Sequence, residues 1–412
     1  MVIVIIGSSI ASKSALETLL PGMKKEDRVI IVTRDRDLFY SRVLLPNYIS
    51  GELEKKDLFF ASRDLVDDRR VSVVNEAVLA VDADNKELRL NSGNTVRYDR
   101  LIITAGASPT GVNVDGEHLP GVFYLRDLED AEGIKDRAKR AKSCVVLGGG
   151  LVALKAATAV KKSGAQVKLI VASSRLLSAI ADETVSRLIF GSLSAEGIDI
   201  RLGASIKQIG GNGQGVRYVA LEDGTVIDAD MVIAGKGVKP NIDIVKGTGI
   251  AVERGILVDA GMETTVKGVY AAGDVAQSMD YLNTRTGLFT LWPDAAQQGR
   301  IAAGSILGLE REYTGGLSMN SFVINGMPFI IIGSIREKDI KGCEVYSNFD
   351  ERRQVYRKIV IRDGKPVGAA FAGDISYAGM VYWDIRAGRA VEEPGKYITK
   401  AGLKQIFTSR LF

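Results

Sequence analysis

The chain has little of what protein-based catalysis and metal binding usually require. Its 412 residues include two cysteines, Cys144 and Cys343, and a single histidine, His118. The cysteines form no C-x-x-C pair and no metal-ligand spacing, which excludes a redox disulfide and a cysteine metal site. One histidine argues equally against a histidine metal site and a Ser-His-Asp triad. The chemistry must therefore come from a bound cofactor, and we expect neither a metal nor a protein catalytic residue.

Other features are also absent. No apolar run approaches the ~18 residues that a membrane span needs. The N-terminus is apolar from its first residues and lacks the charged region and cleavage site of a signal peptide. The net charge of +4 is small for this length and argues against a nucleic-acid partner. Together with an ordinary hydrophobic fraction of 46%, these features predict a cytoplasmic globular protein of two to four domains.

What the chain has in quantity is glycine, 45 residues, many beside apolar runs. The first case is the apolar strand predicted at Val2–Ile6, which is followed by Gly7, a helical stretch and a second strand at Val29–Thr33. A glycine turn between strand and helix lets backbone N–H groups and the helix N-terminus approach a pyrophosphate. Here Ser9 and Ser12 occupy the second and third glycine positions. The alternative is a plain strand–turn–helix that binds no ligand.

The same pattern recurs further along the chain. A strand at Cys144–Leu147 leads into Gly148, Gly149 and Gly150, then a helix with Ala153 at the third glycine position, then a strand at 167–171. Alanine is tolerated at that position of the dinucleotide fingerprint. Two copies of one pattern predict two dinucleotide-binding domains.

The second copy lacks the acidic residue that usually accepts hydrogen bonds from the adenosine ribose. Ala172 and Ser173 follow the strand, and Arg175 comes just after. Ser173 and Arg175 favour a 2′-phosphate, as in NADPH. The alternative is that Arg175 is a solvated surface arginine.

The rest of the chain predicts smaller elements. Segments 71–81 and 87–90 are expected to be short antiparallel strands. After about Tyr313 the pattern alternates as in strands, for example over Val355–Arg362, and closes with helical patches. The predicted fold class is α/β, with two Rossmann-like dinucleotide-binding domains and a small α+β C-terminal domain.

Three segments carry a specific resemblance: Tyr40–Pro46, Leu101–Pro109 and Thr265–Asp274, in this order. Together they resemble the FAD/NAD(P)-dependent pyridine nucleotide-disulfide oxidoreductase superfamily over about residues 1–310. Within it, the chain is most similar to the ferredoxin, rubredoxin and nitrite-reductase type branch. It is also similar to the flavin subunits of aldehyde and 2-oxoacid oxidoreductase complexes.

The resemblance implies a division into domains. Residues 1–112 and 240–310 would bind FAD, and residues 113–239 would bind NAD(P). Residues 311–412 would form an α+β interface or dimerisation domain, so a homodimer is one expected assembly.

The resemblance also implies site residues. Those expected at FAD are Gly7, Ser9, Ser12, Thr33, Asp35, Arg42, Val78, Thr104, Ala105, Gly106, Asp274 and Trp292. Those expected at the nicotinamide nucleotide are Gly148, Gly149, Gly150, Ala153, Lys155, Ser173, Arg175 and Gly237.

Several of these expected roles have structural alternatives. Asp274 would accept a hydrogen bond from a ribitol hydroxyl of FAD, and its alternative is a helix N-cap. Trp292 would shield the flavin, and its alternative is packing at a domain boundary. Lys155 replaces the family's usual glutamate beside the nicotinamide.

The function implied is hydride transfer between NAD(P)H and FAD, coupled to electron exchange with an iron–sulfur carrier protein or with subunits of an oxidoreductase complex. No protein nucleophile is required for it. Two alternatives stay open: an electron-transfer or structural subunit with vestigial nucleotide sites, and a peroxide-forming NAD(P)H oxidase.

Overall fold

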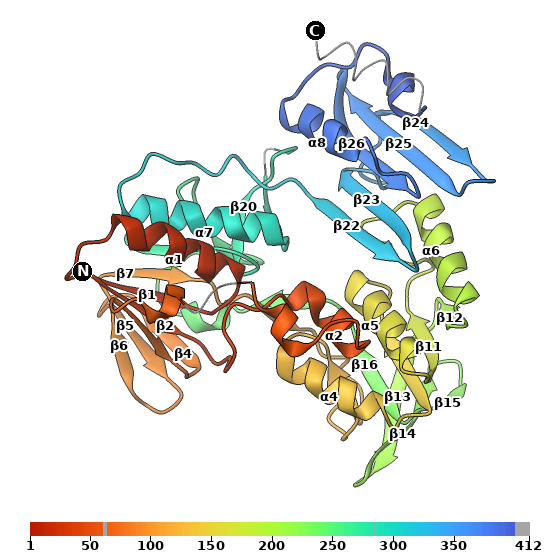
Figure 1. Cartoon of the computed structure of the whole chain (residues 1–412), viewed down its shortest axis with the longest axis horizontal. Coiled ribbons are helices and arrows are strands. Elements are labelled where there is room, and N and C mark those ends of the chain that lie inside the picture. Colours follow the sequence, from red (N-terminus) through yellow and green to blue (C-terminus); the bar gives the residue numbers. More distant parts are fainter. Residues whose placement is uncertain (61–63, 284, 400–412) are drawn as a thin grey trace. The chain divides into compact units, whose positions relative to one another are not determined.

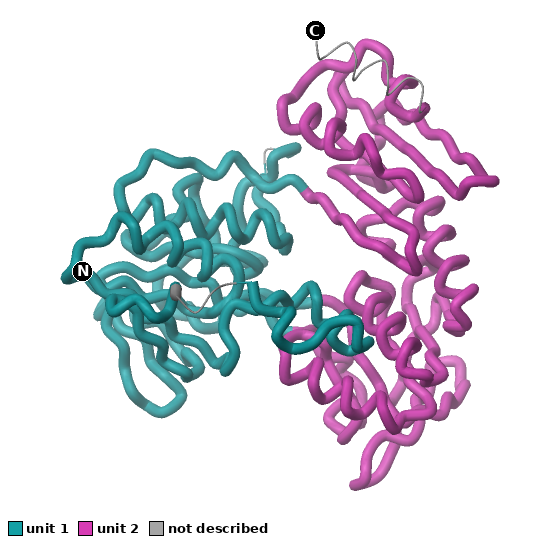
Figure 2. The backbone as a smooth tube through the Cα atoms, viewed as in Figure 1, with its two compact units in different colours: residues 1–108, 238–317 teal, residues 109–237, 318–412 magenta. Residues whose placement is uncertain are grey.

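The computed structural model describes residues 1–60, 64–283 and 285–399. The chain divides into two compact units (Figure 2). Unit 1 comprises residues 1–108 and 238–317, and unit 2 comprises residues 109–237 and 318–412.

Unit 1 is built on a five-stranded parallel sheet of order β19-β7-β1-β2-β3. Its strands are β1 (Val2–Ile6), β2 (Arg28–Val32), β3 (Val71–Val74), β7 (Arg100–Ile103) and β19 (Val269–Ala271). Each of the five contains at most one Arg or Ser, which suits strands of a parallel sheet covered on both faces. The prediction for residues 71–81 was wrong in part, because β3 pairs in parallel with β2 and only the later residues form an antiparallel strand.

Two helices of unit 1 lie side by side, α1 (Ile10–Gly22) and α7 (Trp292–Ile306) (Figure 1). A Cβ on Gly299 would lie only 2.1 Å from the carbonyl oxygen of Ala11, so the two backbones approach as closely as glycine allows. A Pro-Gly pair usually ends a helix, yet α1 includes Pro21 and Gly22 as its last two residues.

Smaller elements complete unit 1. The strands are β4 (Val78–Asp82), β5 (Glu87–Leu90), β6 (Thr95–Arg97), β8 (Ala107–Pro109), β17 (Val238–Pro240), β18 (Ile256–Leu257), β20 (Ala276–Met279) and β21 (Thr286–Leu288). The short helices are η1 (Arg42–Leu44), α2 (Leu45–Ile49), η2 (Lys55–Leu58), α3 (Asp64–Asp67) and η3 (Asp243–Val245).

Unit 2 contains a second five-stranded parallel sheet, of order β12-β11-β10-β16-β9. Its strands are β9 (Val122–Tyr124), β10 (Ser143–Leu147), β11 (Gln166–Val171), β12 (Asp199–Leu202) and β16 (Met231–Ala234). Helices α4 (Leu128–Ala138), α5 (Leu151–Lys162) and α6 (Glu183–Ala195) accompany it, with an antiparallel sheet of β13 (Ile206–Asn212), β14 (Gly215–Leu221) and β15 (Val226–Asp228).

The C-terminal part of unit 2 is a five-stranded antiparallel sheet of order β22-β23-β26-β25-β24. Its elements are β22 (Met319–Ile324), β23 (Met327–Gly333), β24 (Glu344–Asp350), β25 (Val355–Arg362) and β26 (Lys365–Ala372), then α8 (Ala378–Arg386) and η4 (Pro394–Tyr397). An antiparallel sheet with helical segments is the α+β domain that the sequence predicts.

Among the described residues, every helix is too short or too polar to traverse a bilayer. In the same part of the chain, no cluster of three or more His, Cys, Asp or Glu side chains is arranged to bind a metal ion.

Candidate functional site

The first glycine turn follows β1. The N–H of Gly7 donates to the Val32 carbonyl at 2.8 Å, and Gly7 has φ +104°. A Cβ at this residue would stand 2.4 Å from the Thr104 carbonyl oxygen. Glycine is therefore required here for both conformation and space.

The second glycine turn repeats this geometry after β10. The N–H of Gly148 donates to the Ile170 carbonyl at 2.9 Å, its φ is +122°, and a Cβ would lie 2.4 Å from the Gly235 carbonyl oxygen. Gly149 is confined as well, because a Cβ there would lie 2.7 Å from Val171 Cγ1. The two turns are thus structural equivalents.

The remaining fingerprint positions differ in their surroundings. Gly150 has open space around its absent Cβ. Ala153 is fully buried, and a Cβ built on Gly235 would lie 2.9 Å from the Ala153 Cβ, so the helix packs closely on the end of β16. In unit 1 the matching positions are Ser9, which is half-buried, and Ser12, which is fully buried.

At each glycine turn, a residue from a later loop donates a backbone hydrogen bond to the turn while it adopts a strained conformation. The N–H of Phe39 donates to Ser8 O at 2.9 Å, and the N–H of Leu177 donates to Gly149 O at 2.8 Å. Both residues are buried and have positive φ, +54° and +50°. Bulky side chains rarely adopt this conformation, which costs about 1–3 kcal/mol each. The surrounding fold therefore holds both loops against their turns.

The helices that follow the turns have N-termini suited to an anion. Neither Ser9 of α1 nor Gly150 of α5 makes a side-chain cap, and neither helix has an acidic residue in its first turn. By contrast, α4 and α6 are capped by Asp127 and Asp182 and begin with acidic residues. Free N–H groups and the positive helix end favour negative charge, so these two positions fit the pyrophosphate of a dinucleotide.

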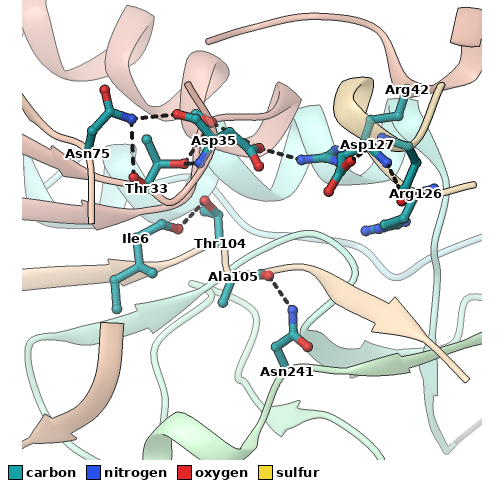
Figure 3. Close-up of polar contacts among 12 residues, drawn as sticks. Ile6, Thr33, Asp35, Arg42, Asn75, Thr104, Ala105, Arg126, Asp127 and Asn241 are labelled. Atoms are coloured by element: carbon teal, nitrogen blue, oxygen red, sulfur yellow. Dashed lines mark hydrogen bonds and ion pairs between the residues drawn. The ribbon is translucent and has the colours of Figure 1, made fainter. Parts of the chain in front are cut away.

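A polar network lies at the carboxyl end of β2 (Figure 3). The Thr33 hydroxyl lies 3.0 Å from the Ser8 hydroxyl and accepts from the N–H of Asp35 at 3.2 Å. The Asp35 carboxylate pairs with Arg42 at 2.5 Å, and Asn75 donates to Asp35 O at 2.6 Å. The network contains the hydroxyl of Thr33 and the carboxylate of Asp35, two residues that the resemblance implies at FAD. The sequence interpretation missed Ser8 and Asn75, because neither occupies a fingerprint position.

The segment after β7 is held from two sides. The Thr104 hydroxyl donates to Ile6 O at 2.6 Å, and the Asn241 amide donates to Ala105 O at 2.8 Å (Figure 3). The N–H of Asn241 also donates to Gly106 O at 3.0 Å. Asn241 thus fixes the path of the segment expected at FAD, although no motif indicated Asn241.

Asp274 lies in the turn between β19 and β20. The N-cap alternative is wrong, because the chain continues from this turn directly into the strand Ala276–Met279. Gly273 has φ +79°, and its N–H donates to Oε1 of the buried Gln298 at 2.8 Å. Gln298 of α7 therefore fixes the turn that carries the Asp274 carboxylate, another role that the sequence did not reveal.

The other residues expected near FAD have simple surroundings. Trp292 is the first residue of α7, and its ring packs edge-to-face against Phe60 at 4.7 Å between centroids. Val78 begins β4 opposite Leu90.

In unit 2, four of the expected nucleotide-site residues make hydrogen bonds or ion pairs within the same unit. The Lys155 ammonium donates to Val323 O at 2.7 Å. The Ser173 hydroxyl donates to Arg175 O at 2.7 Å, and Arg175 pairs with Glu337 at 3.2 Å. Gly237, with φ +101°, follows β16 and accepts from the N–H of Thr110. Lys155 and Arg175 thus both reach the antiparallel C-terminal part.

A buried polar cluster also joins that part to α6. The Asp182 carboxylate accepts from Tyr356 at 2.8 Å and from the Lys358 ammonium at 3.0 Å, while its other oxygen caps α6 at the N–H of Val185. Burial, followed by the nearby Asp182 charge, raises the pKa of the Tyr356 hydroxyl, which therefore stays a donor. No local sequence pattern indicates this cluster, because Asp182 lies more than 170 positions from both Tyr356 and Lys358.

Two obligatory glycine turns, each at the carboxyl end of a parallel strand and before an uncapped helix, define a protein that binds two dinucleotides. Comparison with known families agrees. Residues 1–299 match the pyridine nucleotide-disulphide oxidoreductase family, and residues 320–386 match the rubredoxin NAD+ reductase C-terminal domain. The chain belongs to the pyridine nucleotide-disulphide oxidoreductase family. The predicted family, fold class and enzyme class are confirmed, as are FAD and NAD(P)H as its cofactors.

Several known proteins are similar along most of the chain. The NADH-dependent phenylglyoxylate dehydrogenase subunit epsilon of Aromatoleum evansii is 31% identical over 92% of this chain and 89% of that protein. The nitrite reductase [NAD(P)H] of Bacillus subtilis (strain 168) is 28% identical over 96% of this chain, which spans 48% of that protein. The putidaredoxin reductase–putidaredoxin complex contains a chain of the same fold, with a TM-score of 0.90 at 22% identity over 99% of this chain and 98% of that one.

Proposed function

We propose that the protein transfers hydride between a nicotinamide nucleotide held by unit 2 and FAD held by unit 1, and passes the electrons on to an iron–sulfur protein. The observation that carries this proposal is the pair of equivalent glycine turns, each placed before a helix without a side-chain cap. Each turn offers a pyrophosphate the same combination of close backbone approach and positive helix end.

The residues of unit 1 have defined roles in this proposal. Gly7, Ser9 and Ser12 would surround the FAD pyrophosphate. Thr33 or Asp35 would form hydrogen bonds with the adenosine ribose. Asp274 would accept a hydrogen bond from a ribitol hydroxyl of FAD. Thr104, Ala105 and Gly106 would line the FAD site, and Asn241 holds this segment in place through a hydrogen bond to Ala105 O.

The residues of unit 2 have the matching roles. Gly148 and Gly149 shape the turn, and Gly150 leaves room for the nucleotide phosphates. Bound FAD supplies hydride acceptance and one-electron release, so the protein needs only to bind and orient. The buried Cys144 takes no part in this chemistry, since burial raises the pKa of its thiol.

The proposed acceptor, an iron–sulfur carrier or an oxidoreductase complex, follows the names of the relatives. The rubredoxin-NAD(+) reductase of Pseudomonas putida is 30% identical over 75% of this chain and 80% of that protein. The phenylglyoxylate dehydrogenase relative is a subunit, which favours work within a complex. The domain boundaries predicted from the sequence and the cytoplasmic location stay predictions.

A second candidate function is a stand-alone oxidase that reduces oxygen to peroxide. It is favoured by a relative, the NADH oxidase of Methanocaldococcus jannaschii, which is 27% identical over 90% of this chain and 87% of that protein. Turnover with oxygen alone, at a rate equal to that with an iron–sulfur acceptor, would support this candidate.

An anaerobic titration of the purified protein with NADH and then NADPH tests the main proposal. We expect an oxidised flavin spectrum that bleaches in proportion to added nucleotide. Flavin that neither nucleotide reduces would overturn hydride transfer at unit 2 and favour electron entry from a partner. A protein that contains no flavin and takes up none on reconstitution would favour a structural subunit instead.

A further inference from the structure

The loop after β11 lacks an acid but is held firmly beside the second glycine turn. Strand β11 ends at Val171 and Ala172 follows. The carbonyl of Ser173 accepts from the N–H of Gly203 at 3.0 Å, and the N–H of Leu177 donates to Gly149 O at 2.8 Å. The residues between them, including Arg175, are therefore anchored at both ends next to the turn.

A carboxylate reaches this loop from elsewhere in unit 2. Glu337 follows β23 in the C-terminal part, and its Oε2 lies 3.2 Å from Nη2 of Arg175. The Glu337 side chain is 61% exposed and that of Arg175 is 29% exposed, so solvent and a ligand have access to the pair. A backbone hydrogen bond and the Arg175 guanidinium hold the pKa of Glu337 below its usual range, which keeps the group ionised at neutral pH.

The C-terminal part that carries Glu337 is rigidly placed. The buried Asp182 carboxylate at the start of α6 holds Lys358 of β25, and the same ammonium donates to Ile335 O at 3.0 Å. Ile335 is two residues before Glu337 in the sequence. The contact between Glu337 and the loop is thus supported by a buried ionic anchor, which is the arrangement that keeps a recognition group in position.

We propose that Glu337 replaces the acid missing at the end of β11 and makes the site select a nicotinamide nucleotide with a free 2′-hydroxyl, namely NADH. This inference rests on the proposed function, because it assumes that unit 2 binds a nicotinamide nucleotide. It reverses the preference that Ser173 and Arg175 alone imply, because the sequence interpretation did not include Glu337.

A carboxylate accepts hydrogen bonds from ribose hydroxyl groups, whereas a 2′-phosphate next to it would meet like charge. The ion pair also engages Arg175, the cation that would otherwise attract a phosphate. Removal of the Glu337 charge should therefore free Arg175 to bind the 2′-phosphate.

Equilibrium binding of the adenosine half tests the proposal without requiring electron transfer. The full-length protein with its flavin is titrated calorimetrically with ADP-ribose and with 2′-phospho-ADP-ribose. We expect the wild type to bind ADP-ribose at least about tenfold more tightly. Glu337→Gln should shift the ratio of the two dissociation constants at least about tenfold toward the phosphorylated ligand.

Two further variants test whether the shift in ligand preference depends on Arg175 and on the position of the removed charge. Glu337→Gln combined with Arg175→Ala should lose the gain in binding of 2′-phospho-ADP-ribose. Glu351→Gln removes the same charge from an exposed turn residue of the C-terminal part and should leave the ratio as in the wild type. Thermal unfolding of each variant verifies that the fold is intact.

The proposal is overturned if the wild type prefers the phosphorylated ligand, if it binds neither ligand, or if Glu337→Gln changes the ratio less than about twofold. Reduction of the flavin by NADH, measured on the same preparation, separates this failure from that of the proposed function. Reduction with an unchanged ratio refutes only the role of Glu337. A shifted ratio without reduction supports the role of Glu337 and refutes only the proposed function.

Discussion

Neighbouring glycines of the second turn should respond to the same substitution in opposite ways. Gly148→Ala places a methyl group 2.4 Å from the Gly235 carbonyl oxygen at φ +122°. The strained conformation costs about 1–3 kcal/mol and the forced displacement of the backbone about as much again. We expect the free energy of unfolding to fall by about 2–6 kcal/mol, seen as a lower urea midpoint by circular dichroism.

Gly150→Ala should leave the fold almost unchanged. Gly150 has φ −87° and ψ 168°, which alanine adopts readily, and its absent Cβ faces open space. Loss of a glycine N-cap costs less than ~1 kcal/mol. The added methyl group would stand where the nucleotide phosphates approach, so the dissociation constant of the preferred nucleotide should rise at least about tenfold, or ~1.4 kcal/mol.

The control for both variants is Gly191→Ala in α6, where the absent Cβ also faces open space. It should raise stability by about 0.5–1 kcal/mol through helix propensity and leave nucleotide binding unchanged. Wild-type nucleotide affinity in Gly150→Ala would refute the placement of the phosphates at this turn. A wild-type urea midpoint in Gly148→Ala would refute the steric argument itself.

Three further outcomes are expected. Asp182→Ala should lower the free energy of unfolding by about 3–5 kcal/mol, because Lys358 is left charged and buried; adding Lys358→Met should recover much of the loss in urea unfolding. Burial, and then the charge of Asp127, raise the pKa of Asp130 to about 6. The stability that this carboxyl contributes is complete below its unfolded pKa near 4 and is lost as pH rises through 6, so the advantage of Asp130→Asn over wild type in urea midpoint should grow from pH 4 to pH 7. Gln298→Leu removes the acceptor of the Gly273 N–H and should lower the ratio of flavin to protein absorbance after dialysis.

Elements with a strong local signal were predicted correctly. The strands expected at Val2–Ile6 and Val355–Arg362 have those bounds in the structure. Each is a run rich in β-branched residues and is followed by a turn residue, so the signal that predicts it lies within a few positions. The same holds for the two glycine turns.

Elements whose placement depends on distant partners were not predicted correctly. Strand Val71–Val74 alternates in a way that looks antiparallel, yet it pairs in parallel with Arg28–Val32, about 40 positions earlier. Parallel pairing joins strands across long connections and leaves no turn motif to recognise. Asp274 followed a glycine in a way typical of a helix N-cap, but the next element is a strand.

Residues of the candidate site were likewise predictable only where their signal is local in the sequence. Fingerprint residues were recognisable because their spacing is fixed by the turn itself. Asn241 and Gln298 were missed because each acts on a segment far away or on another element, at Ala105 and Gly273. Glu337 was missed for the same reason, 162 positions from Arg175. Long-range hydrogen bonds of this kind have no local sequence pattern.

The strand order of unit 1 has a consequence for synthesis of the chain. Strand β7 ends at Ile103, but its outer neighbour β19 begins only at Val269, after most of unit 2 has been encoded. At ~5–20 residues per second a ribosome needs roughly 10–30 s to reach β19. During that interval an emerging sheet would carry an apolar open edge along β7, the kind of edge that invites aggregation. We therefore expect the nascent N-terminal segment to depend on chaperones until β19 and α7 emerge and close the sheet.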